Sequence, residues 1–305
     1  MTYQQYGLIQ AADYNNLVDN VNLVWGSGSG SYGYGQTNLP TVAIGAKVSA
    51  AEWTNLVNKI SSIALHQNST ITSVTAPTAG DPVKFVSAID TNINTIQTNR
   101  LNASAQATSV TTSKATTAGW SDKVTFTTTV TFSSAAATRY FFNSGGQLAI
   151  TCSHGSNLST GIDKVFYDLC TAFGTMTLSS GTATIGGTSF TGTTKTGGSG
   201  ALTTAYTISS ATGYYSLTTN PIEIFKQTAT GAIAKYVTSF INVTAKVDAT
   251  GGVITFVTTI DENWSSGIGL PVSAGTTVNL IVKPPSTTYA TTNAWGTPTV
   301  STTYA

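Results

Sequence analysis

Charged residues are scarce in this sequence of 305 residues, at 8% of the chain, where a soluble domain usually carries about 25%. The 13 basic residues nearly balance the 12 acidic ones, and the net charge is +1. Such a chain lacks the density of Lys and Arg that neutralises phosphates, which argues against bulk nucleic-acid binding. No apolar run approaches the roughly 18 residues of a membrane-spanning helix, so we expect no membrane insertion.

Cysteine and histidine are nearly absent as well, with two of each. A structural zinc site needs four ligands and a disulfide scaffold needs several cysteine pairs, so neither is expected. The first six residues show neither the basic nor the apolar stretch of a secretory signal, so we expect reduced thiols. We therefore predict no metal and no cofactor.

Threonine and serine are abundant instead, with 58 and 32 residues. Hydrophobic residues at 40% and aromatic residues at 10% argue against disorder. With so few charges, solubility depends on hydroxyl and amide groups, and a weakly charged surface favours association. The composition predicts a homo-oligomer that is built into a larger assembly.

Residues 1–105 are predicted to form a helical module. Two segments with helical spacing of apolar residues are copies of each other at an offset of 39, since residues 9–18 align with residues 48–57. Ser49 and Glu52 fit a capping box at the start of the second copy. A third helix is predicted from residue 82 to about residue 100, with Pro82 in its first turn.

The apolar face of the two copied helices is the candidate docking face of this module. Amphipathic helices bury such faces against one another or against a partner. Its members are Tyr14, Leu17, Val21, Trp53, Leu56 and Ile60.

Residues 106–305 are predicted to form a mainly antiparallel β module, sandwich-like, because apolar residues now alternate with threonine. Val124, Phe126 and Val130 show this period of two. One inserted helix is expected at residues 162–173, closed by Gly174. The predicted fold class is α+β, with a helical module followed by this β module.

Two stretches of the β module lack a clear pattern. Residues 183–213, rich in Thr and Gly, are expected to form either exposed hairpins or a mobile loop. Residues 139–142 are predicted as a strand, residues 143–146 as its turn, and residues 147–152 as the partner strand. This hairpin would be scaffold and predicts no catalytic role.

The sequence contains only weak matches to catalytic, metal-binding and nucleotide-binding motifs. Residues 28–33 match G-x-G-x-x-G, but a predicted helix precedes them where a dinucleotide site needs a strand, so we predict a flexible connection. Cys152 and His154, with Asp168 and Cys170 downstream, are the one cluster with ligand chemistry, and their number and spacing are poor for zinc. The adjacent carboxylates at 261 and 262 point to opposite faces of a strand and make a poor acid pair. We predict no catalytic residue and no enzyme.

Aromatic residues in polar stretches are the candidate surface-binding residues, because Tyr and Trp bury a large area at low entropic cost. The alternative for each is core or edge packing. They are Tyr214, Tyr215, Trp264, Tyr289 and Trp295.

Three stretches resemble virion structural proteins of tailed bacteriophages, including those of marine and cyanobacterial phages. The first starts with Ala12-Asp13-Tyr14-Asn15-Asn16-Leu17 and continues to residue 36. The second runs from Ala50-Ala51-Glu52-Trp53 to residue 67. The third is Thr138-Arg139-Tyr140-Phe141-Phe142-Asn143 and continues to residue 148. The resemblance implies a non-enzymatic part of the particle.

The working hypothesis is a structural subunit of the tail, baseplate or tail-proximal fibre, found in the virion and assembled in the host cytoplasm. The helical module would dock to other virion proteins and the β module would face outward. A host-surface glycan or receptor-binding protein and a capsid decoration protein are the alternatives, and an envelope polysaccharide hydrolase is the remote one.

Overall fold

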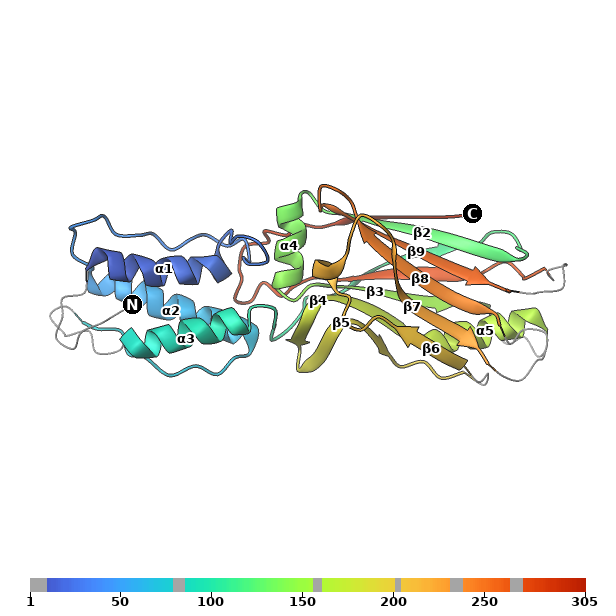
Figure 1. Cartoon of the computed structure of the whole chain (residues 1–305), viewed down its shortest axis with the longest axis horizontal. Coiled ribbons are helices and arrows are strands. Elements are labelled where there is room, and N and C mark those ends of the chain that lie inside the picture. The colour runs from blue at the N-terminus through green and yellow to red at the C-terminus, as the bar shows by residue number, and fades with distance from the viewer. Residues whose placement is uncertain (1–9, 79–85, 156–160, 201–203, 231–237, 264–270) are drawn as a thin grey trace.

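The computed structural model describes residues 10–78, 86–155, 161–200, 204–230, 238–263 and 271–305. Three N-terminal helices and a mainly antiparallel β module lie end to end along one long axis (Figure 1). The two modules bury separate hydrophobic cores. The predicted α+β class is confirmed.

The helical module contains α1 (Ala11–Trp25), α2 (Ala50–Gln67) and α3 (Val86–Thr98). The first two helices begin 39 residues apart, as the copied segments predict. The predicted capping box of α2 is present, since the backbone N–H of Glu52 donates to Ser49 Oγ at 3.3 Å. The predicted start of the third helix at Pro82 lies outside the described residues.

All three helices run in the same direction, toward the β module (Figure 1). Near their N-terminal ends, the rings of Tyr14 and Trp53 meet edge to face with centroids 5.2 Å apart. Near their C-terminal ends, the side chain of Gln97 in α3 donates to Asn20 in α1 at 3.2 Å. Parallel neighbours need long connections, so the chain returns along the bundle in two extended segments, the first strap (residues 36–48) and the second strap (residues 69–78).

Asparagine side chains fasten both straps to the helices. The Asn15 amide donates to the carbonyl of Val42 and accepts from its N–H, both at 2.8 Å. One side chain thus satisfies both backbone groups of a strap residue, as a neighbouring strand would. The same pair of bonds joins Asn22 to Leu39 and Asn92 to Thr72.

The β module is a sandwich of two antiparallel sheets, of order β1-β10-β3-β4-β5 and β11-β2-β9-β8-β7-β6. In β2 the apolar residues alternate with threonine as predicted, and Val124, Phe126 and Val130 face the core. The strands are β1 (Val110–Ala115), β2 (Lys123–Thr131), β3 (Gln147–Ser153), β4 (Thr175–Ile185), β5 (Thr188–Thr196), β6 (Thr204–Ile208), β7 (Ile222–Ala229), β8 (Phe240–Val247), β9 (Val253–Asp261), β10 (Thr277–Lys283) and β11 (Thr299–Tyr304).

The predicted strand at residues 139–142 is wrong, because these residues belong to helix α4 (Ala135–Asn143). Ser134 caps the helix by accepting the N–H of Ala137 on its Oγ at 3.1 Å. The three alanines of the first turn favour a helix, and they lie before the four residues whose alternation suggests a strand. The predicted return strand is confirmed as β3. In the described part of the β module there are therefore two inserted α-helices, where one was predicted.

Helix α5 (Ile162–Phe173) confirms the other predicted helix and ends at Gly174, where φ is +65°. It contacts β3 of one sheet and β7 and β8 of the other, so it fills the space between the sheets. Its Phe173 ring meets that of Phe225 edge to face at 4.9 Å. Of the two alternatives for residues 183–213, the described residues form paired strands: β4 and β5 make a hairpin, and β6 joins the second sheet.

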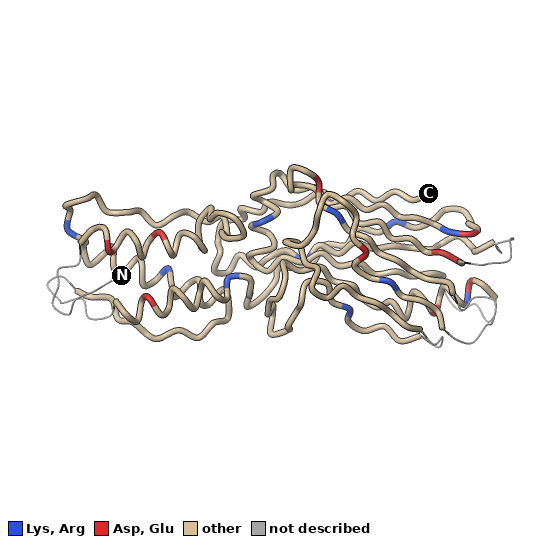
Figure 2. The backbone as a smooth tube through the Cα atoms, in the orientation of Figure 1, with Lys and Arg blue, Asp and Glu red and all other residues tan. Residues whose placement is uncertain are grey.

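Charged residues are few and are scattered along the long axis of the molecule (Figure 2). Two ion pairs occur among the described residues, His154–Asp163 and Lys164–Asp168. Across the same part of the chain, no helix has the length and apolar character to cross a membrane.

Candidate functional site

The six residues of the candidate docking face are core residues of the helical module. Each is at most 3% exposed, and they pack against one another across α1 and α2. The prediction that they form a docking face is therefore corrected, because the apolar stripe is covered by the neighbouring helices of the same chain. The six residues are Tyr14, Leu17, Val21, Trp53, Leu56 and Ile60.

The candidate surface-binding aromatics do not form one surface. Trp295 is 2% exposed and belongs to the sandwich core, so its predicted binding role is wrong. Tyr214 stacks on Phe142 with centroids 4.5 Å apart. Tyr289 is half-buried, and Trp264 lies outside the described residues. Of the five, Tyr215 is 38% exposed.

His154 stands at the centre of a buried polar network that the sequence did not indicate. Its Nδ1 lies 2.8 Å from Thr276 Oγ1 and its Nε2 lies 3.1 Å from Asp163 Oδ1. Trp120 Nε1 donates to the same threonine oxygen at 3.0 Å. The order hydroxyl, imidazole, carboxylate is that of a nucleophile triad. Thr276 is fully buried, however, and its oxygen already has two partners, so no substrate can reach it.

Asp163 links this network to Ser273, in the segment that precedes β10. Burial raises its pKa, but hydrogen bonds from Ser273 and from His154 outweigh that effect, so the pKa lies below its ordinary value. Ser273 donates to the carboxylate from both its backbone N–H (2.8 Å) and its hydroxyl (2.7 Å). The carboxylate therefore stays ionised and orients the imidazole, which is a structural role.

The cluster of Cys152, His154, Asp168 and Cys170, whose spacing is poor for zinc, forms no set of metal ligands among the described residues. Cys152 and Cys170 are both buried free thiols, and burial raises the pKa of Cys170 to about 12, so they are poor nucleophiles. Asp168 pairs with Lys164 one helical turn away. Among the described residues, no group of three or more Cys, His, Asp or Glu side chains could hold a metal ion.

The glycine-rich stretch after α1 joins the two modules, and we call residues 26–35 the junction loop. Gly28, Gly30 and Gly33 all have positive φ, between 57° and 102°. A helix precedes them, so the context of a dinucleotide site is missing, as predicted. At Gly35 (φ +73°), an added Cβ would lie 2.5 Å from the Tyr140 ring, so the loop needs glycine to approach α4.

Side chains of the β module hold the junction loop through its carbonyls. Arg139 Nη2 donates to the Ser27 carbonyl at 2.6 Å, and Asn143 Nδ2 donates to the Gly33 carbonyl at 3.0 Å. The Tyr215 hydroxyl donates to Asn143 Oδ1 at 2.6 Å, so the most exposed candidate aromatic is anchored here. These hydrogen bonds form a specific interface between the helical module and the β module.

Two buried polar residues complete the junction. Gln36 donates to the carbonyl of Thr292 at 2.7 Å and accepts from its N–H at 2.8 Å, which links the first strap to the β module. His66, at the end of α2, is 1% exposed and lies against Tyr34. Burial lowers its pKa to about 4, partly opposed by a hydrogen bond with the backbone of Ser144. It is therefore neutral at pH 7.

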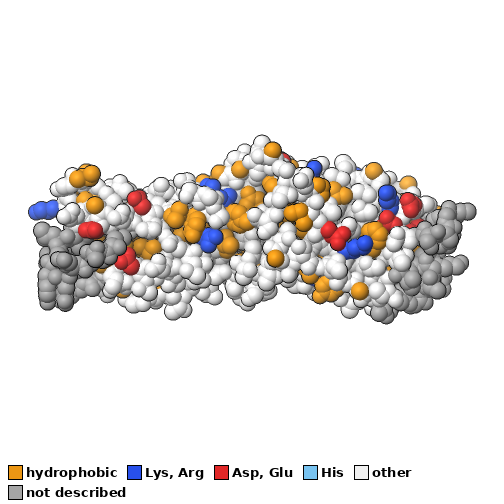
Figure 3. Space-filling view, in the orientation of Figure 1, with side chains coloured by type: hydrophobic (Ala, Val, Ile, Leu, Met, Phe, Trp, Pro, Cys, Tyr) orange, Lys and Arg blue, Asp and Glu red, His pale blue; other side chains and the backbone are white. Residues whose placement is uncertain are grey.

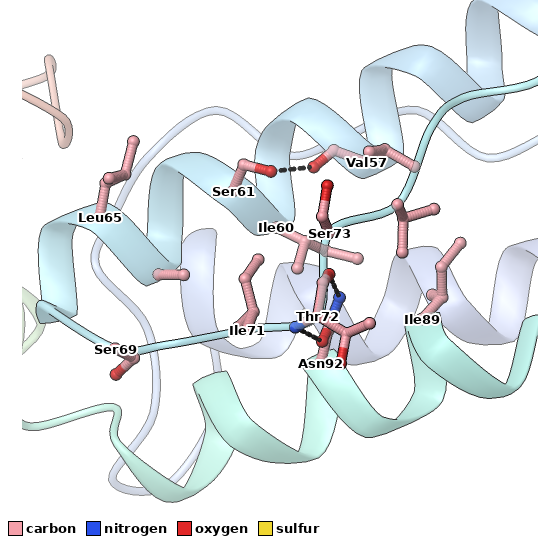
Figure 4. A pocket seen from close by; sticks show the side chains of 12 residues that line it. Val57, Ile60, Ser61, Leu65, Ser69, Ile71, Thr72, Ser73, Ile89 and Asn92 are labelled. Carbon is pink, nitrogen blue, oxygen red and sulfur yellow. Dashed lines mark hydrogen bonds between the residues drawn. The ribbon is translucent and has the colours of Figure 1, made fainter. Parts of the chain in front are cut away.

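An open groove of about 300 Å³ lies between α2, α3 and the second strap (Figure 4). Two of its polar side chains bond to nearby backbone groups: Ser61 donates to the Val57 carbonyl, and Asn92 pairs with Thr72. No charged residue lines it. Apolar lining residues are Val57, Ile60, Ala64 and Leu65 of α2, Ile71 and Val74 of the second strap, and Ile89 of α3.

Comparisons with protein-family models, with curated proteins and with solved structures give no match for this chain.

Proposed function

We propose that this chain is a non-enzymatic structural subunit of a tailed-phage virion, placed in the tail, the baseplate or a tail-proximal fibre. In this proposal the helical module faces the particle and the β module faces outward. The resemblance of residues 12–36, 50–67 and 138–148 to phage structural proteins motivates the assignment.

The observation that carries the proposal is the rod formed by two modules locked end to end (Figure 1). The lock uses Gln36, Arg139 and Asn143, all bonded to backbone groups of the other module. A rigid, weakly charged rod is suited to mechanical work in an assembly, where neighbouring subunits cover its neutral surface. Figure 3 shows how few charged side chains lie on one face of it.

The chemistry within the described residues also favours a structural role. In the triad-like network, His154 and Thr276 are buried and Asp163 is partly exposed, and both thiols are buried. Asp261 and Glu262 differ in burial, the first half-buried and the second fully buried, so they do not face one cleft.

Electron cryo-microscopy and mass spectrometry of purified particles test this assignment. We expect the chain in stoichiometric amounts in the tail region, with the helical end inward. Copies on the head lattice would instead identify a capsid decoration protein. Absence of the chain from purified virions would refute the proposal, and release of sugar from host envelope by the pure protein would favour the hydrolase.

A second candidate function, recognition of a host-surface glycan, is favoured by Tyr206 on β6. The residue is 54% exposed, and its ring stacks on Phe225, with Lys195 Nζ 5.3 Å from the ring centroid. Exposed aromatic faces stack on sugars. A glycan array with the wild-type chain and Tyr206→Ala tests it, with Val110→Ala as a control at another exposed strand position. Binding that survives Tyr206→Ala would exclude this site.

A further inference from the structure

Two arginines of the junction bind neighbouring residues of the junction loop. Arg100, which follows α3, donates from Nη2 to Ser31 Oγ at 3.3 Å, and Arg139 of α4 donates from Nη1 to the Gly30 carbonyl at 3.4 Å. The two guanidinium groups therefore flank one short stretch of the loop. Both arginines are half-buried, and neither forms an ion pair within the described part of the chain. Like charges held close together repel each other, and a carboxylate placed between them would relieve this repulsion.

Both guanidinium groups are held against tyrosine rings. Arg100 Cζ lies 4.4 Å from the ring centroid of Tyr32, and Arg139 Cζ lies 5.1 Å from that of Tyr140. Such cation–π contacts restrict the orientation of a guanidinium group. A side chain that is fixed before binding loses less conformational entropy when a partner arrives. The two arginines are therefore positioned in advance for a ligand.

Each guanidinium group keeps N–H donors that the chain does not use. Of the five N–H groups of an arginine side chain, Arg100 uses one and Arg139 uses two, all toward the junction loop. Neither donates to a carbonyl of α1, α2 or α3 among the described residues, so the nearby helix ends do not occupy these donors. Both Nε atoms are buried and have no acceptor there. A ligand therefore meets the terminal Nη groups.

Two further tyrosines extend this surface on the side of the β module. Tyr215 is 38% exposed, and its hydroxyl oxygen lies 3.2 Å from the carbonyl oxygen of Ser31. The ring of Tyr214 lies 5.0 Å from that of Tyr215. Figure 3 shows hydrophobic and basic side chains together midway along one face, over the junction. Arginine and tyrosine are enriched among the residues that dominate binding at protein interfaces. We name these residues the arginine–tyrosine patch: Tyr32, Arg100, Arg139, Tyr140, Tyr214 and Tyr215.

An acidic segment of a different protein fits this patch best. Carboxylates form the strongest charge-assisted hydrogen bonds with guanidinium groups. A second copy of the chain is a poor source of clustered carboxylates, because its 12 acidic residues are scattered (Figure 2). The adjacent pair in its sequence is Asp261 and Glu262, and Glu262 is fully buried. Nucleic acid fits less well, because two arginines in a chain of net charge +1 neutralise few phosphates.

We propose that the arginine–tyrosine patch is the docking site for an acidic segment of a partner protein. A carboxylate of the partner accepts hydrogen bonds from the free Nη groups, and the side chains next to it pack on the tyrosine rings. Arg100 belongs to the helical module and Arg139 to the β module, so the partner contacts both modules at once and braces the junction. This inference goes beyond the proposed function, because it holds for any assembly that contains the chain.

Fluorescence anisotropy with the full chain and a fluorescein-labelled peptide of glutamates tests the patch, with a peptide of glutamines of the same length as the uncharged probe. We expect the wild type to bind the glutamate peptide, and to bind it more weakly as salt is added. Arg100→Gln should raise the Kd by about tenfold, because it removes charge-assisted hydrogen bonds. Arg100→Lys, which keeps the charge and loses the planar fork, should raise the Kd by less.

Lys226→Gln is the matched control for the loss of one positive charge. Lys226 Nζ lies 4.1 Å from the ring centroid of Phe240, so this variant also removes a cation from an aromatic ring, but on β7 and outside the patch. It should bind the glutamate peptide as the wild type does. The Arg100 side chain makes a single hydrogen bond to the loop, so its variants should fold, and thermal melting checks this.

Several results would overturn the proposal. They are no binding by the wild type, an unchanged Kd for Arg100→Gln, and an equal loss of binding for Lys226→Gln. Tighter binding of a single-stranded oligothymidine would assign the patch to nucleic acid instead. Oligomers of the wild type that Arg100→Gln dissociates in sedimentation velocity would make a second copy the occupant. Failure here leaves the phage assignment untouched, since that is tested on purified particles.

Discussion

Single residues decide how the two modules meet. His66 and Gly35 both lie at the junction, one as a buried ionisable group and the other as a point of close backbone approach. Neither carries chemistry toward a ligand. Each nevertheless contributes measurably to stability, because protonating a buried histidine or adding a side chain at a glycine with positive φ is costly.

Stability should fall as the pH is lowered, and His66 is the cause. Its pKa is lowered from 6.5 to about 4 by burial, so the unfolded chain binds the proton first. The contribution is present above pH 6.5 and is lost as the pH falls toward 4. We expect a loss of about 2 kcal/mol between pH 7 and pH 5 in urea denaturation. His66→Gln should flatten this pH dependence, and an unchanged slope would contradict the assignment.

Gly35→Ala should destabilise the protein more than Gly30→Ala. Both glycines have positive φ, which costs an L-residue about 1–2 kcal/mol. At Gly30 nothing lies within 4 Å of the added Cβ, whereas at Gly35 the Tyr140 ring is 2.5 Å away. Overpacking adds about 1–3 kcal/mol at Gly35. Equal melting temperatures for the two variants would show that the loop does not press against α4.

At the scale of elements, the straps allow three helices to lie parallel. An extended segment alone would leave its N–H and C=O groups to water, and Asn15, Asn22 and Asn92 satisfy one residue each. The straps thus act as single strands whose pairing partner is a helix side chain. The fixed conformation of the straps depends on the neutral side-chain amide of asparagine, which both donates and accepts hydrogen bonds.

Asn15→Asp should loosen the first strap. The substituted carboxylate has no N–H to donate to the Val42 carbonyl, and its negative oxygen repels the carbonyl oxygen. We expect the free energy of unfolding to fall by about 1–3 kcal/mol. Hydrogen exchange at the Val42 amide should speed up. Asn16→Asp adds the same charge at an exposed neighbouring position and should leave exchange unchanged. Similar acceleration in both variants would point to a general charge effect.

The elements with strong local patterns could be predicted from the sequence, and those without could not. The 39-residue copy and the Ser49–Glu52 cap located α1 and α2, and alternation with threonine located β2. Helix α4 was missed because four residues cannot distinguish a period of two from 3.6. An apolar stripe on a helix indicates that this face is buried, but it does not indicate whether the same chain or a partner covers it. The predicted docking face is for this reason part of the core. The His154 network joins residues over 100 positions apart and has no local signal.

At the scale of the molecule, the two cores are separate, and polar side chains make hydrogen bonds across the junction between them. Polar interfaces between modules resemble those of transient complexes and allow relative motion. In this chain the junction is reinforced by amide and guanidinium groups that bond to backbone atoms. The stiffness of the rod should therefore depend on a few hydrogen bonds.

Gln36→Glu should uncouple the modules without disturbing either core. The variant loses the donor to the Thr292 carbonyl and places a carboxylate beside it in a buried site. We expect small-angle scattering to show a broader range of module orientations, with little change in the melting of the β module. Gln97→Glu, at an exposed contact with Asn20, is the control and should scatter like the wild type. A Gln36→Glu variant as rigid as the wild type would assign the stiffness to Arg139 and Asn143.

The common direction of the three helices gives this nearly neutral molecule two electrically different ends. Each helix carries roughly half a positive charge at its N-terminus and half a negative charge at its C-terminus, and here the like ends lie together. Arg100 and Arg139, which have no carboxylate partner among the described residues, lie where the three negative ends converge. At the far tip, Asp13 and Glu52 lie in the first turns of α1 and α2 and accept the backbone N–H groups of Gln10 and Ser49, so the positive ends of these two helices are matched by carboxylates of their own.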